Sequence, residues 1–452
     1  MPEPAILAFD LGTTRLKVAA FDLEGTLLAV DAARNREHHG TDGRVWQDPD
    51  DWWAMAGDLS RKLLSRRELN RYEVAAIGLS ARAGGFVAVD QAGVPILPSW
   101  SDGRQRSQVE RLVEWRRGGA HLSNYAVGLL ARFLWLREAE PAAADRVARL
   151  LYAKDWLVFR MTGRAVTDPT SGPDADDFDR QSIRTLGIEP ALLPDVELPW
   201  KVAGELGASA ARHLGLPASL PVAVGGHDGI CANVGAGAAG PGAFAITIGT
   251  HAVVRAVMTD TPPGAYRFYG MPPGRHIIGG NAVMAGRAAD WFLDSWLEPS
   301  DDEGRRHAFA TMDAEAAKVE PGSGGVRFLP FLSGQVAPEA RPGASAAFVG
   351  LRARHGRAEM YRAVLEGGAC AIRAIWDQVT GWCGKPTRAR FTGSGALSPT
   401  WRQIIVDTID SPCEVVDGVA EARGAAIYAA VAIGAHPDVD RGLGQVDRRG
   451  AI

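Results

Sequence analysis

A short motif occurs twice in this chain, once near the N-terminus and once past the middle. Residues 8–17 read AFDLGTTRLK and residues 245–253 read AITIGTHAV, so that overlaying the two segments aligns Gly12 with Gly249 and Thr13 with Thr250. In both copies an apolar strand enters a Gly-Thr turn and a second apolar strand leaves it. The repeat predicts a duplicated domain.

The length of the chain supports this interpretation. A chain of 452 residues exceeds one ordinary core and predicts two or three domains. Strands alternate with helical patterns, which is typical of layered α/β domains; one such helix should begin in WQDPDDWW, with Asp48 as its cap and Pro49 as its first residue. We place the domain boundary in the glycine-rich residues 235–242, giving domains 1–239 and 240–452.

Composition limits the classes of partner. The chain carries a net charge of -4 and is 46% hydrophobic, which indicates a globular protein and would weakly repel nucleic acid and anionic lipid. The N-terminus lacks the pattern of a signal peptide, and no apolar run reaches about 18 residues, so we expect a cytoplasmic location. The four cysteines are scattered, without the spacing of a metal or redox site.

The two Gly-Thr turns are candidates for binding a polyphosphate. Facing each other, they could offer backbone N–H groups and hydroxyls to phosphate oxygens. Neither the P-loop pattern nor a strand-following Gly-x-Gly-x-x-Gly with its acidic partner occurs. The copies differ in charge before the turn, where the first has Asp10 and the second has Thr247. Asp10 could hold Mg²⁺ directly or through water; the alternative is an aspartate that caps the turn.

A second carboxylate ends another apolar strand. Asp228 lies in GGHDG after the strand at residues 221–224, where it could enter a cleft and act as a general base toward a substrate hydroxyl. The alternative is a surface aspartate in a glycine turn. If the strand continues, the His227 side chain points the opposite way, so we expect a structural role for it. We expect His251 either to approach phosphate or to pack.

The segment LPSWSDGRQR, residues 97–106, combines a tryptophan, a carboxylate and a guanidinium: Trp100, Asp102 and Arg104. Such a trio can bind a vicinal diol, since the carboxylate accepts hydroxyl protons and the ring packs on the carbon skeleton. A solvated charged loop is the alternative. The acidic residues 168–179 lack the glutamate of a calcium loop, so we do not predict a calcium site there.

In this order the motifs resemble those of the FGGY carbohydrate kinases, within the superfamily that includes actin, hexokinase and glycerol kinase. The resemblance covers almost the whole chain. It rests on AFDLGTTRLKVAAFD, WQDPDDWW, SWSDGRQ, GGHDG, AITIGTH, FVGLRARHGRAEMYRAVLEGGA and TGSGALSPTWRQIIVD.

The resemblance implies an α/β fold with two ribonuclease H-like (actin-like ATPase) domains around a central nucleotide cleft. It implies ATP with Mg²⁺ and phosphorylation of a hydroxyl of a ketose or polyol. On matching positions, Asp228 would be the catalytic base and Asp10 would serve the metal, while the sugar would contact Asp102, Asp228, Trp100 and Arg104. The nucleotide would be held by Gly12, Thr13, Thr14, Gly249, Thr250, Gly393, Gly395 and Ala396.

One departure bears on specificity. Residues 81–84 read ARAG where xylulose kinases usually carry Gln-Met-His, so Arg82 could meet an acidic or differently oriented group of the sugar. The partner is expected to be a small sugar or polyol, with neither nucleic acid nor membrane, and a homodimer is left open. An ATPase or an ATP-binding chaperone or scaffold is the alternative function.

Overall fold

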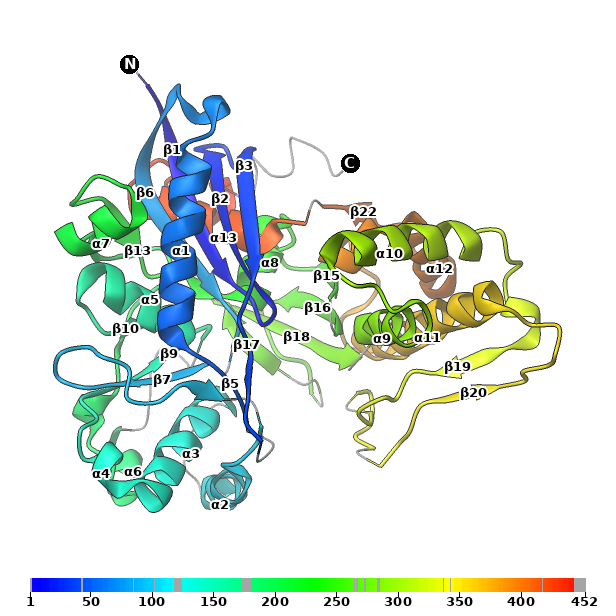
Figure 1. Cartoon of the computed structure of the whole chain (residues 1–452), viewed down its shortest axis with the longest axis horizontal. Coiled ribbons are helices and arrows are strands. Elements are labelled where there is room, and N and C mark those ends of the chain that lie inside the picture. Colours follow the sequence, from blue (N-terminus) through cyan, green and yellow to red (C-terminus); the bar gives the residue numbers. More distant parts are fainter. Residues whose placement is uncertain are drawn as a thin grey trace. The chain divides into compact units, whose positions relative to one another are not determined.

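The computed structural model describes residues 2–41, 44–83, 85–100, 102–117, 124–171, 180–249, 251–263, 265, 267–271, 274–282, 285–335, 337–341, 343–416 and 418–442. The chain forms two compact units (Figure 1). Unit 1 comprises residues 1–237, 270–272 and 421–449, and unit 2 comprises residues 238–269, 273–420 and 450–452. The described residues 421–442 therefore lie with unit 1, whereas the division by sequence assigns them to the second domain.

Unit 1 is built on a mixed sheet in the order β12-β13-β6-β1-β2-β3, with β14 paired to β6. Strands β1, β2 and β3 form the antiparallel meander expected from the sequence, and β6 and β13 run parallel to β1. The strands are β1 (Glu3–Leu11), β2 (Arg15–Asp22), β3 (Leu27–Arg34), β6 (Tyr72–Ala81), β12 (Val202–Glu205), β13 (Pro221–Ala223) and β14 (Gly226–His227).

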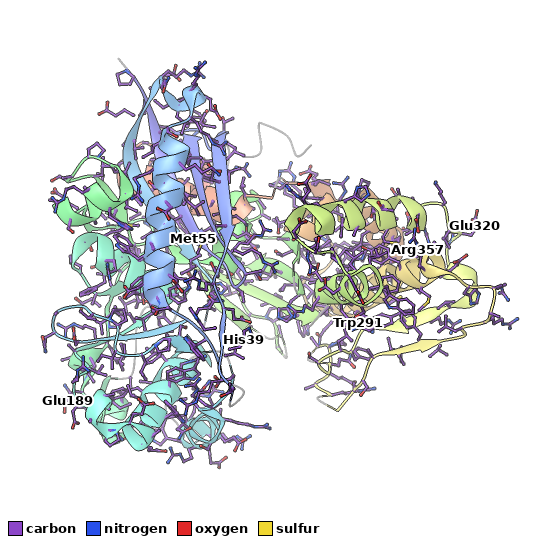
Figure 2. The ribbon with its side chains drawn as sticks, viewed as in Figure 1. His39, Met55, Glu189, Trp291, Glu320 and Arg357 are labelled. Atoms are coloured by element: carbon purple, nitrogen blue, oxygen red, sulfur yellow. The ribbon has the colours of Figure 1, made fainter. Side chains whose placement is uncertain are left out.

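Helix α1 (Pro49–Leu64) confirms the predicted helix start. The Asp48 side chain accepts the N–H of Asp50 at 2.9 Å, and Pro49 occupies the first turn. Figure 1 shows α1 lying along the meander, and its buried side chains pack with Leu7 and Phe9 of β1 and with α5 (Ala153–Thr162) and α7 (Ala208–Leu214). Met55 of α1 lies at the edge of this cluster (Figure 2).

Strand alternation decides where Asp10 points. Because Leu7, Phe9 and Leu11 belong to the cluster under α1, the side chain of Asp10 lies on the opposite face of the sheet. That face carries α8 (Asp228–Gly235) and α13 (Ala420–Ala432), which pack backbone to backbone: a Cβ on Gly424 would lie 2.0 Å from the carbonyl oxygen of Cys231. Asp10 therefore lies on the same side of the sheet as the residue that begins α8.

A smaller group of elements in unit 1 has its own apolar cluster, which includes Trp100. Its helices are α2 (Arg106–Arg117), α3 (Asn124–Ala139), α4 (Pro141–Ala144) and α6 (Arg180–Thr185). Its strands are β4 (His38–His39), β5 (Val45–Gln47), β7 (Phe86–Val89), β8 (Ser99–Trp100) and β9 (Arg149–Tyr152). Two further strands of unit 1, β10 (Val166–Thr167) and β11 (Asp195–Val196), pair with each other. It supplies the loop predicted to bind the sugar.

Unit 2 repeats the sheet of unit 1. Its order is β17-β18-β16-β15-β21-β22, in which β15, β16 and β18 form an antiparallel meander and β21 runs parallel to β15, as β6 does to β1. This shared order confirms the predicted duplication. The strands are β15 (Ala243–Ile248), β16 (Ala252–Met258), β17 (Arg267–Met271), β18 (Arg275–Ala282), β21 (Arg388–Thr392) and β22 (Glu414–Val415), with β19 (Arg327–Leu329) and β20 (Ala347–Val349) as a separate ribbon.

Helix α11 (Arg357–Cys383) is the central helix of unit 2, and its residues between Met360 and Val379 are part of the core, as the sequence predicts. Around it pack α9 (Ala285–Leu297), α10 (Asp302–Ala316) and α12 (Pro399–Ile409). The ring of Trp291 on α9 stacks on Phe328 at 6.0 Å (Figure 2). Across the described parts of both units, no helix combines the length and the apolar character needed to cross a membrane.

Candidate active site

The first Gly-Thr turn joins β1 to β2 and is held by its own backbone and by three side chains. Gly12 N–H donates to the carbonyl oxygen of Arg15 at 2.9 Å. The carbonyl oxygen of Thr13 accepts hydrogen bonds from Asn35, Gln47 and Arg82, each at 3.1 Å. Thr13 and Thr14 are exposed, so their hydroxyls and amides are the groups of this turn that a phosphate can reach, whereas the Gly12 amide is used within the turn.

Asp10 lies at the centre of the sheet and is 2% exposed. It pairs across β2 with Lys17 and across β6 with Ser80. Ser80 Oγ donates to Asp10 Oδ1 at 3.0 Å, and Lys17 Nζ lies 3.3 Å from Asp10 Oδ2 and 3.2 Å from Glu421 Oε2. Burial raises the pKa of Asp10 to about 7, Lys17 opposes this, and the carboxylates of Glu421 and Asp228 add to it.

Asp228 is the first residue of α8, at the positive end of the helix dipole. His227 caps the helix: its Nδ1 accepts the N–H of Gly229 at 3.1 Å, so the neutral ring carries its proton on Nε2, which lies 3.0 Å from Asp228 Oδ1. The prediction that the His227 side chain points away is wrong, because the strand ends at His227 and a helix begins. The side chain of Asp228 is 32% exposed, so a hydroxyl group can reach it.

A buried ion cluster holds the segment before Asp228. Lys154 Nζ lies 2.8 Å from Asp155 Oδ1 and 3.3 Å from Asp168 Oδ2, and it donates to the carbonyl oxygen of Val224 at 3.0 Å. Asp168 accepts the hydroxyl proton of Thr170, whose Oγ1 accepts the N–H of His227 at 3.0 Å. Burial lowers the pKa of Lys154, but the two carboxylates raise it further, and the net shift is upward. The chain of contacts fixes the backbone at His227.

The predicted sugar loop is also organised. Asp102 accepts Arg104 N–H at 3.1 Å, Arg104 Nε at 2.9 Å and Val45 N–H at 2.9 Å, and a further Arg104 nitrogen contacts its second oxygen. Hydrogen bonds from the Arg104 side chain lower the pKa of Asp102 to about 2. The guanidinium of Arg104 lies 4.9 Å from the ring centroid of Trp100, whose Nε1 donates to Gln105 at 2.6 Å. The trio named from sequence is therefore brought together.

Arg82 and Arg132 are two half-buried guanidinium groups beside these acids. Arg82 lies 5.3 Å from the ring of Trp52 and donates to Thr13, as above. Arg132, on α3, donates to the carbonyl oxygens of Gly128 at 3.1 Å and Trp100 at 3.4 Å. Burial is the main cause that lowers the pKa of each to about 10, and Arg132 contributes to the shift of Arg82.

The second turn joins β15 to β16, and it is one residue shorter than the first when counted from the last paired residues, Ile248 with Ala252 against Leu11 with Leu16. Gly249 N–H donates to the carbonyl oxygen of His251 at 2.9 Å, and Thr250 lies outside the described residues. Thr247 pairs with Thr392 of β21 at the position that Asp10 occupies in unit 1; its Oγ1 lies 2.8 Å from Thr392 Oγ1 and accepts Arg255 Nη1 at 2.8 Å. Much of the His251 surface is exposed, but the atoms packed around its ring still remove part of its hydration. This desolvation, followed by the charge of Arg287, lowers the pKa of His251.

The predicted adenosine loop follows β21. Gly393 has φ +86°, and a Cβ there would lie 2.5 Å from the carbonyl oxygen of Ile248; a Cβ on Gly395 would meet the Ile248 side chain at 2.5 Å. Both glycines therefore allow the loop to approach β15 closely. Ala396 is fully buried in the core of unit 2, while Ser394 and Leu397 are exposed.

The groups around Asp10 fit a hydrated Mg²⁺ better than a protein-caged metal. Among the described residues, no three His, Cys, Asp or Glu side chains converge to hold an ion. Mg²⁺ usually keeps several waters and binds one or two carboxylates together with substrate phosphates. Asp10 has a raised pKa and is influenced by Asp228 and Glu421, so a nearby cation would favour its ionised form.

Comparison with known proteins agrees with this geometry. The N-terminal domain of the FGGY family of carbohydrate kinases matches residues 5–235, and the C-terminal domain of that family matches residues 236–433. The chain belongs to the FGGY family of carbohydrate kinases. It is similar to a xylulose kinase from Klebsiella pneumoniae, with 27% identity over 96% of this chain and 91% of the relative.

Two other proteins extend the comparison. The gluconokinase of Bacillus subtilis (strain 168) is 23% identical over 90% of this chain and 83% of its own length. The crystal structure of xylulose kinase from Rhodospirillum rubrum superimposes with a TM-score of 0.80 at 25% identity, covering 97% of this chain and 92% of that one. The predicted family, the two-domain actin-like α/β fold class and the assignment as a carbohydrate kinase are thereby confirmed. Kinases of this family use ATP, generally with Mg²⁺.

Several residues of this FGGY kinase were not found from its sequence. Lys154 and Asp155 stand in the apolar run LYAKDWLVF, and two charges in such a run are a signal for a buried ion pair. Gln47 lies inside WQDPDDWW, which was already recognised as a motif, and Ser80 directly precedes residues 81–84. Arg132 gave no comparable signal, because an arginine on a predicted helix is usually solvated.

Proposed function

We propose that this FGGY-family kinase transfers the γ-phosphoryl group of ATP to a hydroxyl of a ketose or polyol, with Asp228 as the general base. The observation that carries the proposal is the environment of Asp228: a partly exposed carboxylate at the start of α8, oriented by the Nε2 proton of His227. Because relatives of this chain include a xylulose kinase and a gluconokinase, both sugars and sugar acids are among the acceptors to test.

In this proposal Asp228 accepts the proton of the acceptor hydroxyl as its oxygen bonds to the γ-phosphorus, and ADP leaves with the electron pair of the broken P–O bond. The N-terminus of α8 places the positive end of the helix dipole beside this carboxylate. His227 holds the carboxylate in one orientation, and the buried Lys154 cluster holds the backbone beneath His227. These contacts support a base that is positioned before the acceptor binds.

The phosphates are assigned to the two Gly-Thr turns, with Thr13, Thr14 and Thr250 as the contacting residues and Gly12 and Gly249 as the residues that shape the turns. The adenosine is assigned to Gly393, Gly395 and Ala396. Asp10 would hold hydrated Mg²⁺, which supplies charge neutralisation at the phosphates. Asp102, Arg104, Trp100 and Arg82 would bind the acceptor. In support, Asp102 is ionised and held rigidly by Arg104, so it can accept hydroxyl protons.

The test is ADP release from Mg·ATP across pentuloses, hexuloses, polyols and sugar acids, with a no-acceptor control. We expect one acceptor to raise the rate far above that control. Equal ADP release with and without acceptor would instead support the alternative, an ATPase or ATP-binding scaffold of the same superfamily. In Asp228→Asn, ATP binding measured by calorimetry should survive while turnover is lost.

A further inference from the structure

The described residues contain an imbalance of charge beside the proposed acceptor site. Each of the acids there has a cation or a proton donor: Asp102 is paired with Arg104, and Asp228 receives the Nε2 proton of His227. Among the ion pairs of the described residues, none joins Arg82 or Arg132 to a carboxylate. Their hydrogen-bond acceptors are the carbonyl oxygens of Thr13, Gly128 and Trp100.

Arg132 is short of acceptors as well as of counter-charge. Its Nε is buried and has no hydrogen-bond partner, and its bond to Trp100 is long, at 3.4 Å. A buried donor without an acceptor is destabilising, so this atom is unfavourably placed. An acceptor from a ligand would remove that cost.

The charges of the two guanidinium groups and of the two acids influence one another. Arg132 lowers the pKa of Arg82, after the larger effect of burial, while Asp228 raises it; Asp102 and Tyr152 are the groups that raise the pKa of Arg132. Ala81 pairs with His227 in the sheet, so Arg82 and Asp228 are the residues that follow this pair. Arg132 donates to the carbonyl oxygen of Trp100, two residues before Asp102. Glu37 also acts on Arg82, but its side chain is 47% exposed and lies 3.1 Å from His39 Nε2.

We infer that the acceptor is a sugar acid, an aldonate whose carboxylate is bound by Arg82 and Arg132 while its hydroxyls face Asp102 and Asp228. The inference rests on the proposed kinase activity and narrows its substrate class. Guanidinium groups suit a carboxylate because their N–H donors match its two oxygens. With a neutral ketose or polyol, neither guanidinium group would gain an ion pair with a carboxylate.

The first experiment compares acceptors that differ only at one end. Aldonates of the pentoses and hexoses are assayed with Mg·ATP against the polyols of the same configuration, for example gluconate with glucitol and xylonate with xylitol, and against the ketoses. We expect kcat/KM for one aldonate to exceed that of its matching polyol by about 100-fold, since two charge-assisted contacts are lost. A ketose or polyol that equals or exceeds every aldonate overturns the inference.

The second experiment tests the residues through the acid-to-polyol ratio of kcat/KM. Arg132→Gln and Arg82→Gln should each reduce that ratio about 10-fold or more, mainly through KM for the acid, whereas Arg132→Lys should retain part of it. Arg106→Gln, on an 86% exposed side chain paired with Glu110, removes the same charge away from the site and should leave the ratio unchanged. A structural role alone would slow both acceptors equally and leave the ratio at the wild-type value.

Two outcomes separate this inference from the proposed function. If no acceptor raises ADP release, the kinase proposal fails and with it the basis of the inference. If a neutral ketose is the preferred acceptor, the kinase proposal stands and the sugar-acid assignment fails. Thermal melts of each variant identify loss of folding, and Arg132→Lys remains informative if Arg132→Gln does not fold.

Discussion

The two Gly-Thr turns occupy equivalent places in equivalent sheets, yet their chemistry differs. In unit 1 the strand before the turn presents Asp10 between Lys17 and Ser80; in unit 2 it presents Thr247 beside Thr392, with Arg255 as its cationic neighbour. Each arrangement is a central oxygen, a hydroxyl from the parallel strand and a cation from the antiparallel strand. The fold is thus the same in both copies, but the central side chains differ. Of Asp10 and Thr247, only Asp10 has a carboxylate that could bind a metal ion.

The strongest test of the base lies in unit 1. Asp228→Asn should lower kcat by about 10³-fold, because the amide cannot accept the hydroxyl proton, with ADP release in steady state as the measurement. His227→Ala should cost less, about 10-fold, since the carboxylate remains and loses only its orientation. A fully active Asp228→Asn enzyme would remove Asp228 from the base role.

Two matched substitutions test whether the two turns differ in their chemistry. Asp10→Asn should reduce kcat/KM for Mg·ATP by about 100-fold, and Thr247→Val, the matched change in unit 2, by less than about 10-fold. Because burial raises the pKa of Asp10, replacing this carboxylate should not lower the melting temperature, so that activity and stability separate. Equal losses in the two variants would show that the two turns share their chemistry as well as their fold.

A pair of glycines tests whether the two sheets also share their packing. Gly225 has φ +72°, and a Cβ added there would lie 2.0 Å from the carbonyl oxygen of Leu79. Gly393 has φ +86°, and a Cβ added there would lie 2.5 Å from the carbonyl oxygen of Ile248. Alanine at either site should lower the free energy of unfolding by about 3 kcal/mol or more, with the larger effect at Gly225. Chemical denaturation measures both, and Gly240→Ala, where an added Cβ has no neighbour within 4 Å, is the control.

The smallest expected effect concerns the sugar loop. The pKa of Asp102 is about 2, below its ordinary value of 3.8, so its interaction with Arg104 stabilises the fold above that ordinary value and is lost as the pH falls toward 2. Asp102→Asn should therefore lower stability by about 1 kcal/mol near pH 7, and the difference from wild type should shrink between pH 4 and pH 2. Melting curves across this range provide the measurement; a gap that is constant with pH would contradict it.

Much of this architecture could be predicted from sequence because the signals are local. The repeated Gly-Thr turn, the Asp48–Pro49 helix start and the strand before Asp228 depend on neighbouring residues, and the structure agrees with each. The orientation of His227 could not be predicted, since it depends on whether a strand continues or a helix begins at that point. The contacts of Arg132 and Lys154 join segments far apart in the chain, so periodicity gave no indication of their partners.

The buried cluster of Lys154, Asp155 and Asp168 has a consequence for the solution conditions in which the enzyme can work. Mobile ions weaken attraction between exposed charges but reach a buried group poorly, and the side chains of this cluster are at most 2% exposed. The segment that leads into Asp228 is thus anchored by a force that added salt does not screen. High ionic strength should weaken exposed ion pairs such as Arg106–Glu110 at salt concentrations that leave the Lys154 cluster intact.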